Sequence, residues 1–181
     1  MTKQALGFTL IELMISVAIL SILSVLAISS YSAVTSYWQA EETRTALYTG
    51  FISAKTQAFN AGRTTVICPS SDGLSCMNST AWHHGWIIFQ DNNKNREMDA
   101  DDQQISTQNA LPDGLHLTST SGRTRLVFQA NGSNGGTNVT FTLCDARGAN
   151  KAKSLIISNS SRIRTAAADP LTAEYSCNSS S

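Results

Sequence analysis

The chain has 181 residues, and its 13 Lys and Arg residues balance 13 Asp and Glu residues, so the formal net charge is zero. This balance excludes a polyanion-binding function that depends on overall charge, and leaves only uneven local charge as a basis for one. The length permits one globular domain beyond an N-terminal segment.

The N-terminal segment from Phe8 to Ala27 is apolar, and its only formal charge is Glu12. At about 1.5 Å per helical residue, the segment is long enough to cross the roughly 30 Å hydrocarbon core of a bilayer. A carboxylate just inside such a span costs about 2.5–3.5 kcal/mol on insertion scales, and the segment contains no Lys or Arg to pair with it. An amino terminus created by cleavage beside Gly7 would supply the missing cation.

The stretch Gly7-Phe8-Thr9-Leu10-Ile11-Glu12 resembles the class III signal sequence of type IV pilins and type II secretion pseudopilins, and the short leader containing Lys3 matches as well. The resemblance implies that prepilin peptidase cleaves after Gly7 and that Phe8 is methylated. It also implies that Glu12 pairs with the terminal amine of a neighbouring subunit during assembly. The alternatives are a plain membrane anchor and an ordinary signal peptide, although the apolar run exceeds the about 7–15 residues typical of the latter.

The next stretch, from Ser29 to Asn60, has no proline and one glycine, and its apolar residues recur at near-helical spacing. We therefore predict that a helix with a transmembrane half over residues 8–28 continues into an amphipathic half over residues 29–61. Gly62 is suited to end this helix. Residues 1–7 form the predicted leader peptide, and residues 62–181 form the predicted β-rich head.

After Gly62 the pattern changes to short β-rich runs separated by Asn, Asp, Ser and Gly. No internal repeat or second domain emerges. The predicted strands are Thr64–Cys68, Gly85–Gln90, Leu115–Thr118, Arg125–Gln129, Val139–Cys144 and Leu155–Ser158.

Four cysteines lie in the part that a membrane anchor would place outside the cytoplasm, and their even number indicates two disulfides. Among the three connectivities we favour Cys68–Cys76, which brackets a turn-rich stretch, and Cys144–Cys177, which ties the C-terminal tail to a strand. A zinc site formed by the four thiols is the alternative, but it lacks the usual C-x-x-C spacing.

The order of several motifs in the head indicates which branch of the pilin-like proteins the chain resembles. Val66-Ile67-Cys68-Pro69 is followed by Trp82, by Gly85-Trp86-Ile87-Ile88-Phe89-Gln90-Asp91 and by Arg125-Leu126-Val127-Phe128. This order resembles the FimT/FimU minor pilins and their type II secretion homologue, pseudopilin GspH, over nearly the whole chain. The resemblance implies an α+β fold in which a long N-terminal helix packs against an antiparallel two-sheet β head.

Catalytic and metal-binding patterns are poorly represented. His83 and His84 are predicted loop residues without the nucleophile and carboxylate of a triad, so the chain is predicted to be a peptidase substrate rather than an enzyme, with no cofactor. The segment from Asp91 to Asp102 matches an EF-hand loop at positions 1, 3, 5 and 12, but Arg96 replaces its central glycine. We predict a polar hairpin loop there, with calcium binding as the alternative.

Charge is unevenly distributed within the head. Six acids and two bases lie between Asp91 and Asp113, whereas seven bases and one acid lie between Leu115 and Thr165. A local excess of positive charge attracts phosphates.

The element Ser161-Arg162-Ile163-Arg164 resembles the Gly-Arg-x-Arg element with which FimT-type pilins bind DNA during natural transformation, with serine in place of the glycine. On an extended segment the two arginines point the same way. A solvated basic edge or a pilin–pilin contact is the alternative. The predicted DNA-binding residues are Arg162 and Arg164, aided by Arg147, Lys151 and Lys153.

These features predict a minor type IV pilin at or near the pilus tip that supports pilus assembly and DNA uptake. Its expected partners are prepilin peptidase, other major and minor pilins or pseudopilins, and double-stranded DNA. It is expected in the bacterial inner membrane as a single-pass protein with a periplasmic head, and then in the filament. The alternatives are a GspH-type pseudopilin of type II secretion and a purely structural tip pilin without DNA contact.

Overall fold

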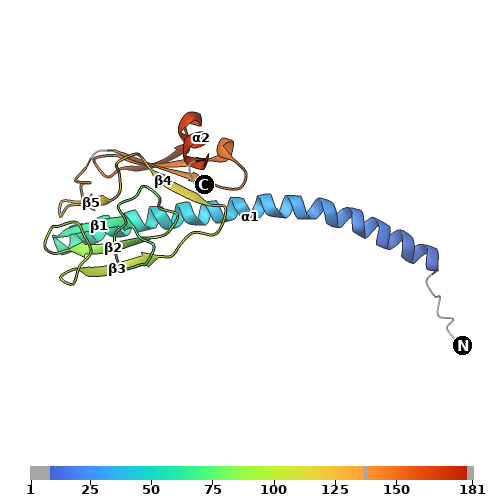
Figure 1. The fold of residues 1–181 in the computed structure, drawn as a ribbon, viewed down its shortest axis with the longest axis horizontal. Coiled ribbons are helices and arrows are strands. Elements are labelled where there is room, and N and C mark those ends of the chain that lie inside the picture. Colours follow the sequence, from blue (N-terminus) through green and yellow to red (C-terminus); the bar gives the residue numbers. More distant parts are fainter. Residues whose placement is uncertain (1–8, 137, 179–181) are drawn as a thin grey trace, which may run out of the picture. The chain divides into compact units, whose positions relative to one another are not determined.

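The computed structural model describes residues 9–136 and 138–178, without the side chains of residues 25–30. The chain separates into two compact units, residues 1–35 and residues 36–181. Helix α1, Leu10–Ala61, contributes to both units (Figure 1).

The first unit contains the beginning of α1. Thr9 caps it, because the Glu12 N–H donates to the Thr9 hydroxyl (3.4 Å) and the Leu13 N–H donates to the Thr9 carbonyl (3.2 Å). All side chains from Thr9 to Ser24 are exposed. Among the described residues, no helix combines the length and apolar character of a membrane span. The transmembrane half over residues 8–28 therefore stays a prediction.

The second unit contains two antiparallel sheets of four strands each (Figure 1). Sheet A has the order β3-β2-β1-β5, and sheet B has the order β4-β6-β7-β8. The strands of sheet A are β1 (Thr64–Pro69), β2 (Trp86–Asp91), β3 (Gln103–Gln108) and β5 (Leu126–Phe128). Those of sheet B are β4 (His116–Ser119), β6 (Val139–Cys144), β7 (Lys153–Ile157) and β8 (Ile163–Ala167).

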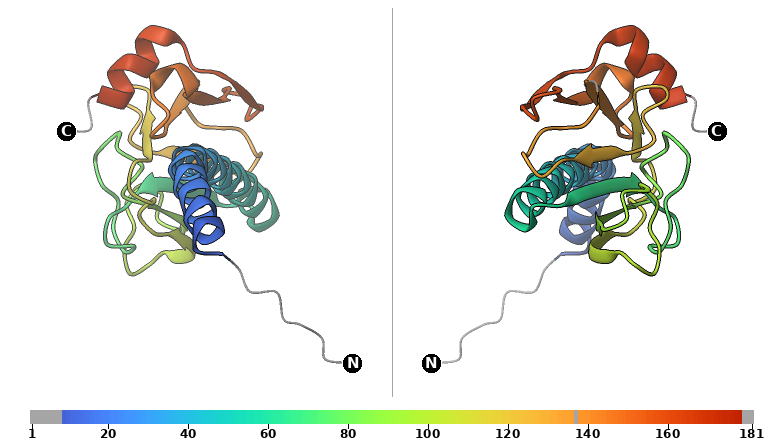
Figure 2. Two further views of the ribbon diagram at one scale, coloured as in Figure 1. Left: turned by 90° about the vertical axis from the view of Figure 1, so that its right-hand side faces the viewer. Right: turned by 90° about the vertical axis from the view of Figure 1, so that its left-hand side faces the viewer.

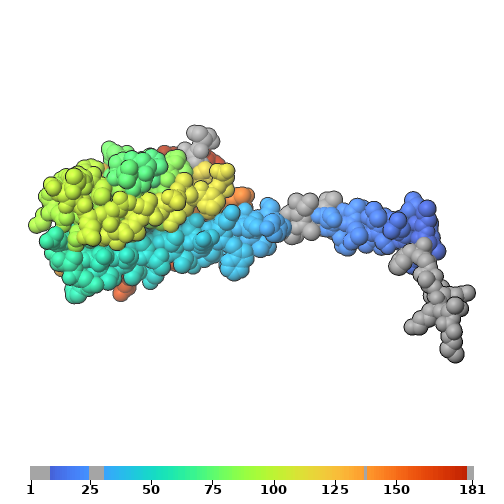
Figure 3. Space-filling view, turned by 90° about the horizontal axis from the view of Figure 1, so that it is seen from below, coloured from blue at the N-terminus to red at the C-terminus, as the bar shows by residue number. Residues whose placement is uncertain are grey.

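Residues 36–61 of α1 lie against both sheets and form one core with them, as Figure 2 shows. Phe51 is fully buried and packs on Phe141 of β6, with ring centroids 5.1 Å apart. Ala54 and Ala58 are also buried, and their small side chains let the sheets approach the helix closely. The opposite side of this helical stretch stays uncovered in Figure 3. Tyr48 and Phe59 of this stretch are exposed.

The predicted α+β fold, with a long helix and a two-sheet antiparallel head, is therefore confirmed. Among the strands and α-helices, β3, β8 and the C-terminal helix were not predicted. Strand β3 is a polar edge strand in which only Ile105 packs on the core. For β8, the sequence predicts an extended segment around Arg162 and Arg164 but no strand. Helix α2, Pro170–Asn178, begins after Asp169, whose side chain accepts the Thr172 N–H (3.1 Å).

Two disulfides fix the periphery of the head, and they have the pairing favoured from the sequence. Cys68–Cys76 closes the loop after β1, and Cys144–Cys177 fastens α2 to the end of β6. Ala173 of α2 packs beside Cys144, so α2 covers part of sheet B on the side away from α1.

Candidate functional site

The β7–β8 hairpin carries the predicted arginine pair. Its turn is closed by the Ser161 N–H, which donates to the Ser158 carbonyl (2.8 Å), and by the Ser158 N–H, which donates to the Arg162 carbonyl (2.9 Å). Ser161 has a φ of 60°, a left-handed conformation. A three-residue hairpin loop characteristically needs one residue of this kind at its third position, where glycine is the usual choice. Serine therefore occupies the place of the glycine without displacing the turn.

The register of β8 against β7 places the arginines. Arg164 lies opposite Ile156, and Ile163 lies opposite Ile157. Because neighbouring residues of a strand face opposite sides, Ile163 packs on the core while Arg164 faces away from α1. Arg164 on this edge strand and Arg162, directly before it, are both exposed. Among the described residues, neither of them forms an ion pair.

Arg147 is in a different situation. Its guanidinium donates two hydrogen bonds to the Asp145 carboxylate, at 2.9 and 2.6 Å, and stands 5.1 Å from the centre of the Tyr37 ring. The hydrogen bonds that Arg147 donates to Asp145 raise the pKa of Arg147. Because Asp145 is buried and neutralises it, Arg147 contributes little free charge to the surface.

The two predicted lysines are exposed, but the structure does not bring them to the arginine pair. Lys151 ends a short 3-10 helix, η1 (Ala149–Lys151). Lys153 begins β7 opposite Ala167, three residues from the position that faces Arg164. That offset corresponds to about 10 Å along the strand, and an odd offset also puts Lys153 on the other face of the sheet.

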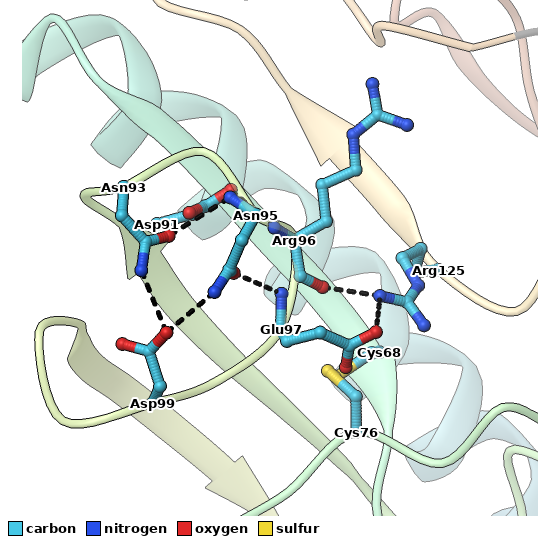
Figure 4. A network of polar contacts seen from close by, with 9 residues as sticks. All are labelled: Cys68, Cys76, Asp91, Asn93, Asn95, Arg96, Glu97, Asp99 and Arg125. Atoms are coloured by element: carbon cyan, nitrogen blue, oxygen red, sulfur yellow. Dashed lines mark hydrogen bonds and ion pairs between the residues drawn. A yellow bond between two sulfur atoms is a disulfide. The ribbon is translucent and has the colours of Figure 1, made fainter.

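The segment from Asp91 to Asp102 joins the paired strands β2 and β3, so the predicted hairpin is confirmed. Figure 4 shows its polar network. The side-chain amides of Asn93 and Asn95 donate to Asp99, at 2.8 and 2.7 Å, and the buried Asp91 accepts the Arg96 N–H (3.1 Å). Among the candidate calcium ligands, Asn93 and Asn95 are thus bonded to Asp99, whereas Asp91 and Asp102 accept backbone N–H groups. In the described part of the chain, no group of three or more His, Cys, Asp or Glu residues is placed to hold a metal ion.

Arg125 fastens this loop to sheet A. Its guanidinium pairs with Glu97 (2.6 Å) and donates to the Arg96 carbonyl (2.5 Å) (Figure 4). Of the seven bases between residues 115 and 165, Arg125 and Arg147 are therefore paired, which distinguishes them from Arg162 and Arg164.

The N-terminal processing residues are only partly described. Gly7 and Phe8 lie outside the described residues. Glu12 is exposed in the first turn of α1, where its carboxylate accepts a long hydrogen bond from the Thr9 hydroxyl (3.5 Å). A carboxylate in the first helical turn also interacts favourably with the helix dipole.

The chain's three histidines form a cluster that was not predicted from the sequence. The His83 ring lies 4.4 Å from that of His84 and 5.4 Å from that of His116, which comes from β4. Burial lowers the pKa of His83, and the two neighbouring rings add to this effect. His83 and His84 are neighbours in the sequence, so their proximity could be predicted. His116 comes close to them only because the sheet topology places β4 beside them.

Comparison with known proteins agrees with the architecture. Residues 43–161 match the family model of the type II transport protein GspH, and residues 2–28 match the prokaryotic N-terminal methylation motif. A search of curated proteins finds no significant match. The type IV minor pilin FimU of Pseudomonas aeruginosa is similar in structure, with a TM-score of 0.54 and 22% identity over 78% of this chain and 98% of that chain. The minor pseudopilin EpsH from the type 2 secretion system of Vibrio cholerae gives a TM-score of 0.51 and 14% identity over 71% and 97%.

The helix, the two sheets and the methylation motif define the class: a type IV pilin-like minor pilin or pseudopilin. Within this class, the chain belongs to the GspH family, whose model covers more than half of its length. Members of the class are structural filament subunits rather than enzymes, and the methylation motif marks a substrate of a processing enzyme.

Proposed function

We propose that the chain is a minor pilin of a type IV pilus, incorporated at or near the tip, whose head binds DNA during natural transformation. The observation that carries the proposal is the arginine pair. Arg162 and Arg164 are exposed at the start of an edge strand, and neither forms an ion pair within the described residues.

The chemistry of the pair suits phosphate groups. Guanidinium groups bind phosphate oxygens in a bidentate manner, and such contacts act on any sequence because they involve the backbone of the nucleic acid. Ser161 supports the proposal, since its left-handed backbone supplies the turn that glycine would give. Lys151 and Lys153 add long-range attraction rather than direct contacts, because they lie away from the pair.

The N-terminal segment is proposed to act in assembly. Prepilin peptidase would cleave after Gly7 and methylate Phe8, and the helix would hold the protein in the inner membrane with a periplasmic head before its extraction. Glu12 would then pair with the amine of a neighbouring subunit. Mass spectrometry of the mature protein tests this step: a first residue other than methylated phenylalanine would exclude it.

The DNA-binding proposal is tested by fluorescence anisotropy with the full chain in detergent micelles and a short labelled duplex. Removing two phosphate contacts should weaken binding of Arg162→Ala/Arg164→Ala by at least about tenfold at moderate salt, and should lower the slope of log affinity against log salt by about two. The matched control is Lys94→Ala/Arg96→Ala, which removes two exposed cations from the β2–β3 loop. An equal loss of DNA affinity in both variants, or no DNA binding by the unmodified chain, would contradict the DNA-binding proposal. The chain would then be a purely structural tip pilin.

A second candidate function is that of a minor pseudopilin in type II secretion. It is supported by the GspH family match and by the likeness to EpsH. Deletion of the gene distinguishes the two. Loss of transformation with normal secretion supports the pilus, whereas exoproteins retained in the periplasm support the pseudopilus.

A further inference from the structure

The outer face of sheet B, the one directed away from α1, has an unusual composition. Cross-strand register puts Thr140 of β6 opposite Ile156 of β7, and Ile156 opposite Arg164 of β8. The neighbouring row joins Thr118, Thr142 and Ser154. The intervening residues, such as Phe141 and Leu155, face the core instead. One side of the sheet is therefore apolar and buried, and the other carries hydroxyl groups with an arginine at its edge.

Helix α2 turns this face into a groove of about 930 Å³. Ten of the fifteen described residues that line it are serine or threonine, and none of the fifteen is Lys or Arg. The one acid among these described residues is Asp169, whose carboxylate caps α2. The groove is thus rich in hydrogen-bonding groups but almost free of charge.

The wall formed by α2 adds an aromatic surface. Tyr175 lines the groove and is 76% exposed. Cys177, two residues after Tyr175, links this helix to β6 through its disulfide with Cys144. The tyrosine ring is therefore carried by a fixed element. An exposed aromatic ring on a fixed support is a surface on which a nucleobase stacks without sequence preference.

The groove and the arginine pair are continuous. Ile156 lines the groove and is the direct cross-strand neighbour of Arg164. Strands are spaced by about 4.8 Å, so the backbone of Thr140 lies two spacings, or about 10 Å, from that of Arg164. A ligand bound by its phosphates at β8 therefore has to extend only about 10 Å across the sheet to reach the hydroxyl groups.

Duplex DNA suits the arginines but not the groove, because its bases are already stacked and paired. A single strand offers phosphates to Arg162 and Arg164, sugar and base edges to the hydroxyl groups, and an open base face to Tyr175. We propose that the outer face of sheet B, from the arginine pair to Tyr175, binds a single-stranded segment of DNA. This inference rests on the DNA-binding function proposed above and names the form of DNA that the site prefers.

The test uses the full chain in detergent micelles, with a labelled oligothymidine of about twelve nucleotides and a duplex of the same length. Tyr175→Ala should weaken oligothymidine binding about tenfold, which lies within the range of one lost base–aromatic stack, and should change duplex binding less than about twofold. Tyr175→Phe should retain the affinity because it keeps the ring. Tyr48→Ala, at an exposed tyrosine of α1, should change neither ligand.

The outcomes separate this inference from the function on which it rests. If Tyr175→Ala binds oligothymidine as tightly as the unmodified chain, or loses both ligands equally, the single-strand site is wrong. The proposed function survives that result as long as Arg162→Ala/Arg164→Ala still weakens duplex binding. Absence of binding to either ligand by the unmodified chain would overturn both. Thermal unfolding of each variant verifies that the exposed substitutions leave the head folded.

Discussion

Ser161 holds the β7–β8 turn in a backbone conformation that costs most residues about 1–2 kcal/mol. Its hydroxyl is buried and has no hydrogen-bond partner in the described part of the chain, so the side chain does not offset that cost. The residue nevertheless directs Arg162 and Arg164 away from the core. A single strained position thus determines how the candidate site faces the solvent.

Replacing this residue by glycine should make the head more stable. Ser161→Gly removes the left-handed strain and the unpaired hydroxyl, and the gain exceeds the added entropy of the unfolded chain. We expect about 0.5–1 kcal/mol of additional stability, measured by chemical denaturation. Ser160→Gly is the matched control, because Ser160 is exposed and is not among the described residues with positive φ. A destabilising effect of Ser161→Gly larger than that of Ser160→Gly would contradict the turn geometry.

The histidine cluster should make stability depend on pH. Burial is the main cause that lowers the pKa of His83 below its usual 6.5, with smaller contributions from His84 and His116, while a hydrogen bond to the Leu117 carbonyl opposes the shift. The unfolded chain therefore binds this proton more readily than the folded chain does. The resulting stability is complete above about pH 6.5 and is lost as the pH falls through the folded-state pKa.

This pH dependence can be measured as the free energy of unfolding between about pH 7.5 and 5. We expect a decline in the unmodified chain and a flatter profile in His83→Gln, because the substituted side chain does not titrate. His84→Gln, at an exposed position, should flatten the profile less. Identical profiles for His83→Gln and the unmodified chain would show that the cluster does not control stability.

At the scale of elements, the two disulfides play unequal parts. Cys68 and Cys76 are separated by 8 residues, whereas Cys144 and Cys177 are separated by 33. The second also fixes α2, which walls the groove on sheet B. The longer closed loop removes more conformational entropy from the unfolded chain.

The chain-entropy argument gives an ordering that can be measured. Replacing both cysteines of the 68–76 pair by serine should cost about 2.5 kcal/mol, and the same change at the 144–177 pair should cost about 3.8 kcal/mol. Chemical denaturation of the two double variants provides the comparison. A larger loss at the 68–76 pair would contradict this ordering.

Most elements could be predicted because their apolar residues follow a regular period. Strand β3 could not, since its polar sequence has little to bury at a sheet edge. The start of α2 carried a legible signal in Asp169-Pro170, a capping residue followed by a proline at the first helical position. The arginine pair was predictable as a local motif. The groove was not, because Thr118 and Tyr175 meet only through strand order and a disulfide.

At the scale of the whole molecule, each of the two units exposes side chains of a kind that usually contacts a partner. The described start of α1 exposes all of its apolar side chains, from Leu10 to Leu23, and a bilayer or neighbouring subunits would cover them. The head exposes two arginines that form no ion pair with any described residue, beside a hydroxyl-lined groove. The first feature suits a subunit of a filament, and the second suits a subunit that carries a ligand.

The most direct test of this account is the transformation frequency of a strain whose chromosomal gene carries Arg162→Ala/Arg164→Ala. The account predicts a fall of about tenfold or more, in keeping with two lost phosphate contacts, while the number of pili per cell and the level of the protein stay unchanged. The strain with Lys94→Ala/Arg96→Ala should transform normally. Normal transformation by the arginine variant, with the protein present in the filament, would contradict the account.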